Sequence, residues 1–460
     1  MVNFKSTTRI LFVVIWTIVT FIECYWFDIA LNTQQNMALV SWLVVCNLVL
    51  QALTLKWCRL SLVSFFFAFI FFYYVFHFGQ VFIAGLFPHY KLDYLNYVEV
   101  YMTDNTTLDK TIRLCIVSIN AFFIGGLLAK DGVVNEKTNC NRSSFSIVIK
   151  KTFLLLLPFR LFVDGVQLYA ASVLGYYGAI KATNMIPGVI ASIGNMWYAL
   201  VPLYYLTLNT QTKKKFYLIV ILLYMVVTML TGNRGHQIVC LASLMIVMLS
   251  TLRKIKFVTI AKYGLMVWVG MLFVDIVYSM RETSISDFFA NPTAFMDSTG
   301  NSNILLETIG TFGETIYTPY LTIMGNGCEY HTWFGEAFVK SVIGVIPDVF
   351  GWFKEINNAA IFPKNLGTKS AIGGSFCGEM FYNFKGVYPL MSAFFGCVYC
   401  YLSNIACASI KTRKYENAIM AIIICSLALW WVRDAIGNLT RQIVWIYWIL
   451  LFFQRKYKRI

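Results

Sequence analysis

The segment "LVSFFFAFIFFYYVFHFGQVFIAGLF", residues 62–87, decides the class of this protein, because it contains no Asp, Glu, Lys or Arg. A helix needs roughly 20 mostly apolar residues to cross about 30 Å of bilayer hydrocarbon, and this segment is long enough. Membrane barrels are built from strands in which apolar and polar residues alternate, and the segment shows no such alternation. It is therefore predicted to be a transmembrane helix.

The rest of the chain repeats this pattern. Of its 460 residues, 58% are hydrophobic and only 13% are charged, which excludes a water-soluble globular protein. No internal repeat, low-complexity tract or soluble domain interrupts the sequence. We predict an all-α polytopic membrane protein that forms a single integral domain over residues 1–460. About twelve transmembrane helices are expected, near residues 10–30, 37–55, 62–87, 111–129, 152–172, 187–208, 216–231, 236–251, 257–279, 387–409, 417–433 and 442–454.

The basic residues predict the orientation of the chain. The formal net charge is +15, but the Lys and Arg residues are concentrated in alternate loops, which argues against a nucleic-acid-binding surface. With a cytoplasmic N-terminus, most of the 37 Lys and Arg residues fall in cytoplasmic loops, together with only three acidic residues, Asp131, Glu136 and Glu416. This asymmetry follows the positive-inside rule. Both termini are therefore predicted to be cytoplasmic.

One connection is much longer than the others. Residues 281–385, between the ninth and tenth spans, form a large outer loop that is rich in Gly, Asn, Thr and aromatic residues. Its apolar patches argue against disorder, and amphipathic stretches such as residues 333–353 predict short helices in the plane of the membrane interface. Loops of this length are usually functional. Cys328 and Cys377 both fall in this region, and a disulfide between them is left open.

Arg234 is a candidate anion-binding residue. It lies in "TGNRG", residues 231–235, a turn on the outer side between two short predicted spans. Short helices allow such a turn to dip below the bilayer surface, where irregular backbone is tolerated only beside a wet cavity. A guanidinium there offers five N–H donors that suit a phosphate. The alternative is a surface turn with an interfacial arginine.

Further outer-side arginines are candidates for the same role. Arg433 and Arg441 are expected, with Asp434, in the outer turn between the last two spans, and Arg281 ends the ninth span. On a helix, Arg433 and Asp434 would diverge by about 100° and need not neutralise each other. The alternative for each arginine is an anchor or an ordinary polar turn at the membrane surface.

Arg160 and Asp164 are four residues apart within the predicted fifth span, on one helical face. A charge in the bilayer is costly unless it faces the bundle interior or water. Two interpretations remain open. Arg160 either belongs to a cavity wall near a lipid headgroup, or it forms an intrahelical pair that orients the helix. Pro158 is expected to bend the helix at this point.

The segment "KSAIGGSFCGEMFYNFKG", residues 369–386, offers the densest set of functional side chains. Glu379 and Asn383 are four residues apart and are expected on one helical face, with Tyr382 beside them. Aromatic, amide and carboxylate groups together suit a carbohydrate ligand. The alternative for Glu379 is a carboxylate that caps a helix N-terminus. His331 is a further candidate in the outer loop, and no pair of His residues has the spacing of metal ligands.

Taken together, these segments resemble the O-antigen polysaccharide polymerases (Wzy-type). The resemblance covers roughly residues 150–445 and rests on the order and sidedness of four short patterns rather than on any one of them. The patterns are "PFRLFVDGVQLYAASVLGYYGA" at residues 158–179, "TGNRG" at 231–235, "GGSFCGEMFYNFKG" at 373–386 and "VRDAIGNLTR" at 432–441.

The resemblance implies a multi-pass glycosyltransferase of the bacterial inner membrane that needs no cofactor or metal and works on the periplasmic side. Such enzymes join oligosaccharide repeat units carried on undecaprenyl pyrophosphate, in O-antigen (lipopolysaccharide) or capsule biosynthesis, and a chain-length regulator and a flippase are possible partners. Glu379 is the first choice for the base, with His331 and Asp434 after it. The alternative function is a lipid-linked oligosaccharide flippase or another polysaccharide transporter. The expected substrate-binding residues are Arg234, Arg433, Arg441, Arg281, Arg160, Tyr382 and Asn383.

Overall fold

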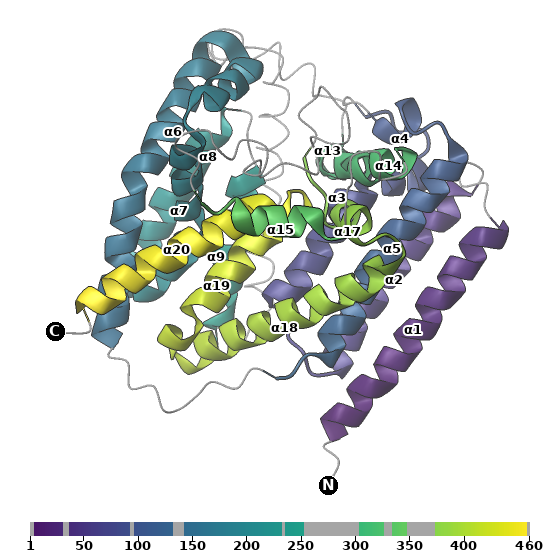
Figure 1. Cartoon of the computed structure of the whole chain (residues 1–460), viewed down its shortest axis with the longest axis horizontal. Coiled ribbons are helices and arrows are strands. Elements are labelled where there is room, and N and C mark those ends of the chain that lie inside the picture. The colour runs from purple at the N-terminus through teal and green to yellow at the C-terminus, as the bar shows by residue number, and fades with distance from the viewer. Residues whose placement is uncertain are drawn as a thin grey trace. The chain divides into compact units, whose positions relative to one another are not determined.

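Helices and turns make up the described part of the chain, and no strand occurs there, which confirms the all-α prediction (Figure 1). The structure is a computed structural model that describes residues 4–30, 36–92, 96–131, 142–231, 235–252, 303–325, 334–346 and 373–457. In chain order, the helices are α1 (Phe4–Ala30), α2 (Met37–Trp57), α3 (Phe65–Leu86), α4 (Tyr97–Val100), α5 (Asn105–Leu128), α6 (Arg142–Met185), α7 (Gly188–Thr207), α8 (Gln211–Met229), α9 (Gly235–Ser250), α13 (Ile304–Phe312), η2 (Gly313–Ile316), α14 (Tyr317–Met324), α15 (Glu336–Ile343), α17 (Phe376–Phe384), η3 (Lys385–Val387), α18 (Tyr388–Thr412), η4 (Tyr415–Ala418), α19 (Ile419–Ala428), η5 (Leu429–Val432) and α20 (Ile436–Tyr457).

Seven candidate membrane spans occur among the described residues, so the chain is a multi-pass membrane protein. Helix α9 and the run from α19 through η5 are apolar but shorter. The predicted span at residues 257–279 lies outside the described residues, and the total of twelve and the orientation stay predictions. The seven candidates are Thr7–Tyr25, Met37–Trp57, Phe65–Leu86, Asn105–Leu128, Gly188–Thr207, Phe376–Thr412 and Ile436–Lys456.

The chain divides into two compact units, each built from separate stretches of sequence. The first unit comprises residues 1–133, 309–405 and 428–440. The second unit comprises residues 134–308, 406–427 and 441–460. The predicted outer loop is partly helical where it is described, because it contains α13, η2, α14, α15 and α17.

Aromatic packing fixes α17 inside the first unit. The ring of Phe376, at the start of α17, is fully buried and meets three other rings edge to face with centroids within 5.5 Å of its own. These are Phe69 of α3, Phe122 of α5 and Trp431 of η5, with ring centroids 4.9–5.5 Å away. Edge-to-face contacts at this distance are the preferred geometry for aromatic pairs. The short helix α17 is therefore held by elements from three distant parts of the sequence.

Helix α6 carries the backbone irregularity of the second unit. It continues through Pro158 and is interrupted at Gly175, whose φ of 68° and ψ of −168° are not helical. Only glycine adopts such a conformation at low cost. The long helix therefore consists of two helical segments that meet at Gly175.

Candidate functional site

Ser375 directly precedes α17 and caps it. Its hydroxyl accepts a hydrogen bond from the Gly378 amide at 3.3 Å. The imidazole of His77 lies 2.8 Å from the same hydroxyl, and its other nitrogen lies 3.1 Å from the Tyr73 carbonyl oxygen. Because the nitrogen facing a carbonyl must carry the proton, the other nitrogen of a neutral His77 accepts a hydrogen bond from the Ser375 hydroxyl. The N-cap role is filled by Ser375, which leaves the next acidic side chain, Glu379, to other partners.

The Glu379 carboxylate caps a different helix. Its Oε2 accepts hydrogen bonds from Trp431 Nε1 at 2.7 Å and from the Ile436 amide at 3.0 Å. Ile436 is the first residue of α20, so the carboxylate lies at the positive end of that helix. Only 1% of the Glu379 surface is exposed. Glu379 thus fills the alternative role of a capping carboxylate, but it lies in α17 and caps α20.

Asp434 lies in the short connection before α20, next to the atoms that bind Glu379. Its Oδ1 accepts hydrogen bonds from the Ala435 amide at 2.8 Å and from Asn438 Nδ2 at 2.9 Å. Burial raises the pKa of Asp434 to about 6, against the opposing effect of these hydrogen bonds and of the neighbouring Arg433 charge. A carboxyl group with this pKa exchanges its proton close to neutral pH.

Two glycines bring the start of α17 against the connection that contains Asp434. A Cβ atom on Gly374 would lie 2.4 Å from the Asp434 carbonyl carbon, and one on Gly373 would lie 2.8 Å from the Arg433 carbonyl oxygen. Neither position has room for a side chain. The two backbones therefore touch, which holds Asp434 and the α17 N-terminus at a fixed separation.

Arg433 faces another element of the outer loop. Its Nη2 forms an ion pair with Glu314 Oε1 of η2 at 2.5 Å, and its guanidinium lies 5.9 Å from the Phe76 ring centroid. Both charged side chains are partly exposed. Arg433 and Asp434 thus have different partners, as predicted for residues that need not neutralise each other.

Tyr382 and Asn383 lie on α17 and are buried. The expected common face of Glu379 and Asn383 is confirmed, because Asn383 Nδ2 donates to the Glu379 carbonyl oxygen at 2.9 Å. The other end of the Asn383 amide accepts a hydrogen bond from Ala337 of α15 at 3.0 Å. Both ends of this amide are therefore engaged with protein groups, and its contact with sugar stays a prediction.

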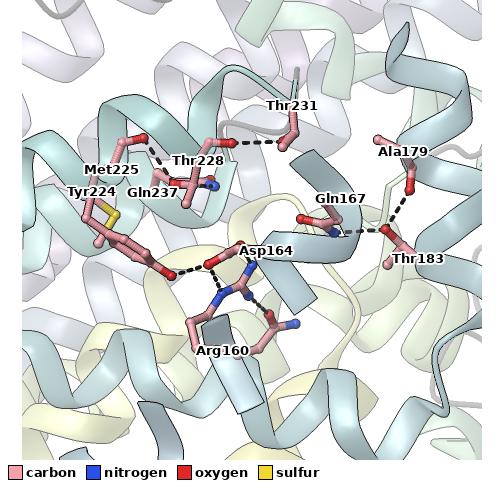
Figure 2. Close-up of polar contacts among 11 residues, drawn as sticks. Arg160, Asp164, Gln167, Ala179, Thr183, Tyr224, Met225, Thr228, Thr231 and Gln237 are labelled. Atoms are coloured by element: carbon pink, nitrogen blue, oxygen red, sulfur yellow. Dashed lines mark hydrogen bonds and ion pairs between the residues drawn. The ribbon is translucent and has the colours of Figure 1, made fainter. Parts of the chain in front are cut away.

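Arg160 forms the intrahelical pair with Asp164 in the second unit, where Figure 2 shows the cluster. Arg160 Nε donates to Asp164 Oδ2 at 2.7 Å and Nη1 donates to Asn195 Oδ1 at 2.7 Å. Tyr224 donates its hydroxyl to the same carboxylate. The Arg160 guanidinium also lies 4.8 Å from the Tyr198 ring centroid. These contacts confirm the pair and favour its orienting role.

The remaining predicted residues have different outcomes. Arg441 was expected in the outer turn but lies within α20, where its guanidinium is 5.9 Å from the Trp445 ring centroid. Helix α20 begins at residue 436 rather than near 442 because Glu379 supplies a cap there. Arg234, Arg281, His331 and Cys328 lie outside the described residues. Cys377 is buried, with its Sγ 3.5 Å from Cys115 Sγ.

Sequence patterns alone missed two residues of this site. Trp431 supplies a hydrogen bond to Glu379, and Glu314 pairs with Arg433. Trp431 lies two residues before the predicted Arg433, and its position in the sequence gave no sign of a partner. Glu314 is one of ten acidic residues of the outer loop, and nothing in the sequence singled it out.

Comparison with known families agrees with the resemblance. A family model described as O-antigen polysaccharide polymerase Wzy matches residues 9–457, nearly the whole chain. The chain belongs to this family. Membership implies O-antigen polymerisation by a glycosyltransferase-type enzyme that acts on lipid-linked oligosaccharide repeat units in the membrane. Comparison with curated proteins and with solved structures found no match.

In the first unit of this Wzy family member, three predicted residues come together. Glu379 and Asp434 flank the first residue of α20, and Arg433 is adjacent to Asp434 in the chain. Arg160 lies in the second unit. The candidate site is therefore the group formed by Arg433, Asp434 and Glu379 together with Glu314 and Trp431.

Proposed function

We propose that this chain joins oligosaccharide repeat units carried on undecaprenyl pyrophosphate at the periplasmic face of the bacterial inner membrane. The product is O-antigen or a related capsule polysaccharide, and the transfer uses no metal. The family match supports the polymerase over a flippase. The observation that carries the site is the convergence of Arg433, Asp434 and Glu379 around the start of α20. A chain-length regulator and a flippase are expected partners.

The reaction exchanges one bond for another. The acceptor hydroxyl oxygen bonds to the anomeric carbon at the lipid end of the growing chain. The bond between that carbon and the pyrophosphate oxygen breaks, and undecaprenyl pyrophosphate leaves. The hydroxyl proton passes to a carboxylate that acts as general base. The growing chain thereby moves onto the non-reducing end of the next lipid-linked unit.

Asp434 suits the base better than Glu379. Its pKa of about 6 makes it mostly ionised, yet still basic, at neutral pH. Asp434 is half-buried, and the hydrogen bonds described above use only its Oδ1, whereas the Glu379 carboxylate is almost fully enclosed and accepts hydrogen bonds on both oxygens. We assign Glu379 to holding the first turn of α20, and with it Asp434, in position. His331 stays a prediction for the same chemistry.

Arg433 suits the leaving pyrophosphate. Its guanidinium has five N–H donors, of which the pair with Glu314 uses Nη2. Negative charge develops on the pyrophosphate as the bond breaks, and preorganised donors stabilise it. Arg234, Arg281 and Arg441 are further candidates for this role.

A complementation experiment tests the function and the base together. Cells that lack the protein receive the wild-type chain, Asp434→Asn, Glu379→Gln or Asp131→Asn, and the length ladder of their surface polysaccharide is compared on gels. Asp131 is an exposed carboxylate that forms an ion pair with Arg9, and it serves as the matched control. Asp434→Asn should leave single repeat units, because loss of a general base lowers rates by about 10²–10⁴-fold.

The other variants distinguish the role of Asp434 as the base from the positioning role of Glu379. Glu379→Gln should keep a ladder, and Asp131→Asn should be normal. A normal ladder from Asp434→Asn at wild-type protein level contradicts the base assignment. If cells without the protein still make a full ladder, the polymerase function itself is wrong.

A further inference from the structure

Four tyrosines gather in the first unit next to the candidate site. Tyr97 and Tyr101 come from α4 and the residue after it, and Tyr317 and Tyr320 come from α14. The Tyr97 and Tyr317 ring centroids are 4.9 Å apart, and Tyr101 and Tyr317 are 5.8 Å apart. Tyr320 stacks on Tyr317 at 6.0 Å. These residues are called the tyrosine cluster, and the two helices that carry it lie side by side in Figure 1.

The tyrosine cluster is buried at one end and open at the other. Tyr320 is buried, Tyr97 and Tyr317 are half-buried, and 49% of Tyr101 is exposed. A tyrosine ring has an apolar face and a hydroxyl that needs a hydrogen-bond partner. The exposed end therefore presents both stacking surface and polar groups to a ligand.

The backbone under the tyrosine cluster is fixed. The Tyr97 amide donates to Gln80 Oε1 of α3 at 3.0 Å, and Asn96 caps α4 through the Val98 amide. Gln80 is fully buried. A surface held in this way loses little conformational entropy when a ligand binds.

The tyrosine cluster is connected to the candidate site through α14 and η2. Glu314, which pairs with Arg433, precedes Tyr317 by three residues. Thr318, which follows Tyr317, donates its hydroxyl to the Gly373 carbonyl oxygen at 3.0 Å. Backbone contact of η2 with α3 fixes this segment, since a Cβ on Gly313 would lie 2.3 Å from the Gln80 nitrogen. The segment formed by η2 and α14 thus carries both Glu314, the partner of Arg433, and two of the four rings, those of Tyr317 and Tyr320.

We propose that the tyrosine cluster is a saccharide-binding subsite that holds the growing polysaccharide beside Arg433 and Asp434. The proposal rests on the polymerase function proposed above. Sugar rings offer C–H faces that stack on aromatic rings and hydroxyls that pair with polar groups, and this chemistry matches the exposed end of the cluster. Tyrosines also anchor proteins at the membrane interface, and the experiment separates that role from saccharide binding.

The experiment measures saccharide binding directly. The full-length protein in lipid nanodiscs is titrated with lipid-free polysaccharide of several repeat units, released by mild acid from the host cell's own O-antigen. Tyr101→Leu removes the ring but keeps an apolar side chain for the lipid, and Tyr101→Phe keeps the ring. Tyr401→Leu is the matched control, because Tyr401 is 42% exposed on α18 within a candidate span.

Tyr101→Leu should raise the Kd of the wild-type protein about tenfold, which corresponds to one good aromatic contact. Tyr101→Phe should bind nearly as tightly as the wild type, and Tyr401→Leu should not change the Kd. Equal affinity of the wild type and Tyr101→Leu, or no binding by the wild type, overturns the proposal. An equal loss in Tyr401→Leu also overturns it, because it assigns the effect to membrane anchoring.

The length ladder of the polysaccharide distinguishes a failure of the subsite proposal from a failure of the proposed function. Cells with Tyr101→Leu should make shorter chains that still contain more than one unit, whereas Asp434→Asn should stop at single units. Normal binding by Tyr101→Leu with a collapsed Asp434→Asn ladder disproves the subsite alone. Lost binding by Tyr101→Leu in a chain that proves not to polymerise would disprove the function and leave the saccharide site standing.

Discussion

Replacing Glu379 by alanine removes the acceptor for two donors at once, one buried and one part-buried. Trp431 Nε1 and the Ile436 amide both donate to its carboxylate, at 2.7 and 3.0 Å. Each buried donor that loses its partner costs about 1–3 kcal/mol, so Glu379→Ala should lower the stability of the chain by roughly 2–6 kcal/mol. The first turn of α20 should be affected most, because Ile436 begins it.

Glutamine should behave differently at the same position. Both donors approach the same oxygen, Oε2, so the carbonyl oxygen of Glu379→Gln can accept both hydrogen bonds. What it loses is the second acceptor oxygen, because the Ile436 nitrogen also lies 3.2 Å from Oε1, where glutamine would place a donor. The expected order of stability is therefore wild type, then Glu379→Gln, then Glu379→Ala with a clear gap.

Thermal unfolding of the purified full-length chain in detergent, followed by circular dichroism, measures this order. Asp131→Ala is the control, because an exposed ion pair contributes at most about 1 kcal/mol. Equal unfolding temperatures for Glu379→Ala and the wild type would refute the capping role. Equal destabilisation by alanine and glutamine would show instead that both carboxyl oxygens are needed to hold α20.

Four more predictions concern charged residues. If Asp434 is the base, polymerisation by reconstituted protein should increase between about pH 5 and pH 7, because the base works deprotonated and its pKa is about 6; a flat profile would contradict this. The pKa of Asp434 in the folded chain is above its value of about 3.9 in the unfolded chain, so the protonated carboxyl group favours the folded state. The stability that Asp434 contributes is therefore full below about pH 4 and declines up to about pH 6. Asp434→Asn should remove this decline in unfolding experiments. Arg433→Lys keeps the charge but loses the planar fork, and it should shorten the polysaccharide ladder at normal protein level; an unchanged ladder would leave Arg433 with a purely structural pairing. Arg160→Met should lower the free energy of unfolding by about 3–5 kcal/mol, because Asp164 loses its ion-pair partner. Adding Asp164→Leu should recover most of that stability. Additive losses of the two variants in thermal unfolding would show that the residues do not act as a pair.

Local sequence patterns predicted the helices well. Residues 62–87 contain a helix at 65–86, because the length and hydropathy of a span depend only on neighbouring residues. The Arg160–Asp164 pair was predictable for the same reason, since residues four apart share a helical face. The start of α20 was predicted six residues too late, because its cap comes from another helix.

Contacts between distant segments were not predictable from one sequence. Glu379 and Ile436 are separated by 57 residues, and Arg433 and Glu314 by 119. Nothing in the sequence showed that the double glycine at 373–374 packs against residues 433–435. The candidate residues were thus identifiable by type, whereas their partners depend on the three-dimensional arrangement.

The cap that Glu379 gives to α20 also bears on how the chain is made. Ala435, the residue before α20, has no side-chain acceptor of its own. A chain synthesised from its N-terminus produces α17 well before α20, so the acceptor already exists when the last helix leaves the ribosome. The first turn of α20 can then bind to the Glu379 carboxyl group, which is already in place, as the helix enters the membrane. A chain cut between α18 and α19 and expressed as two pieces should therefore assemble less well when the first piece carries Glu379→Ala.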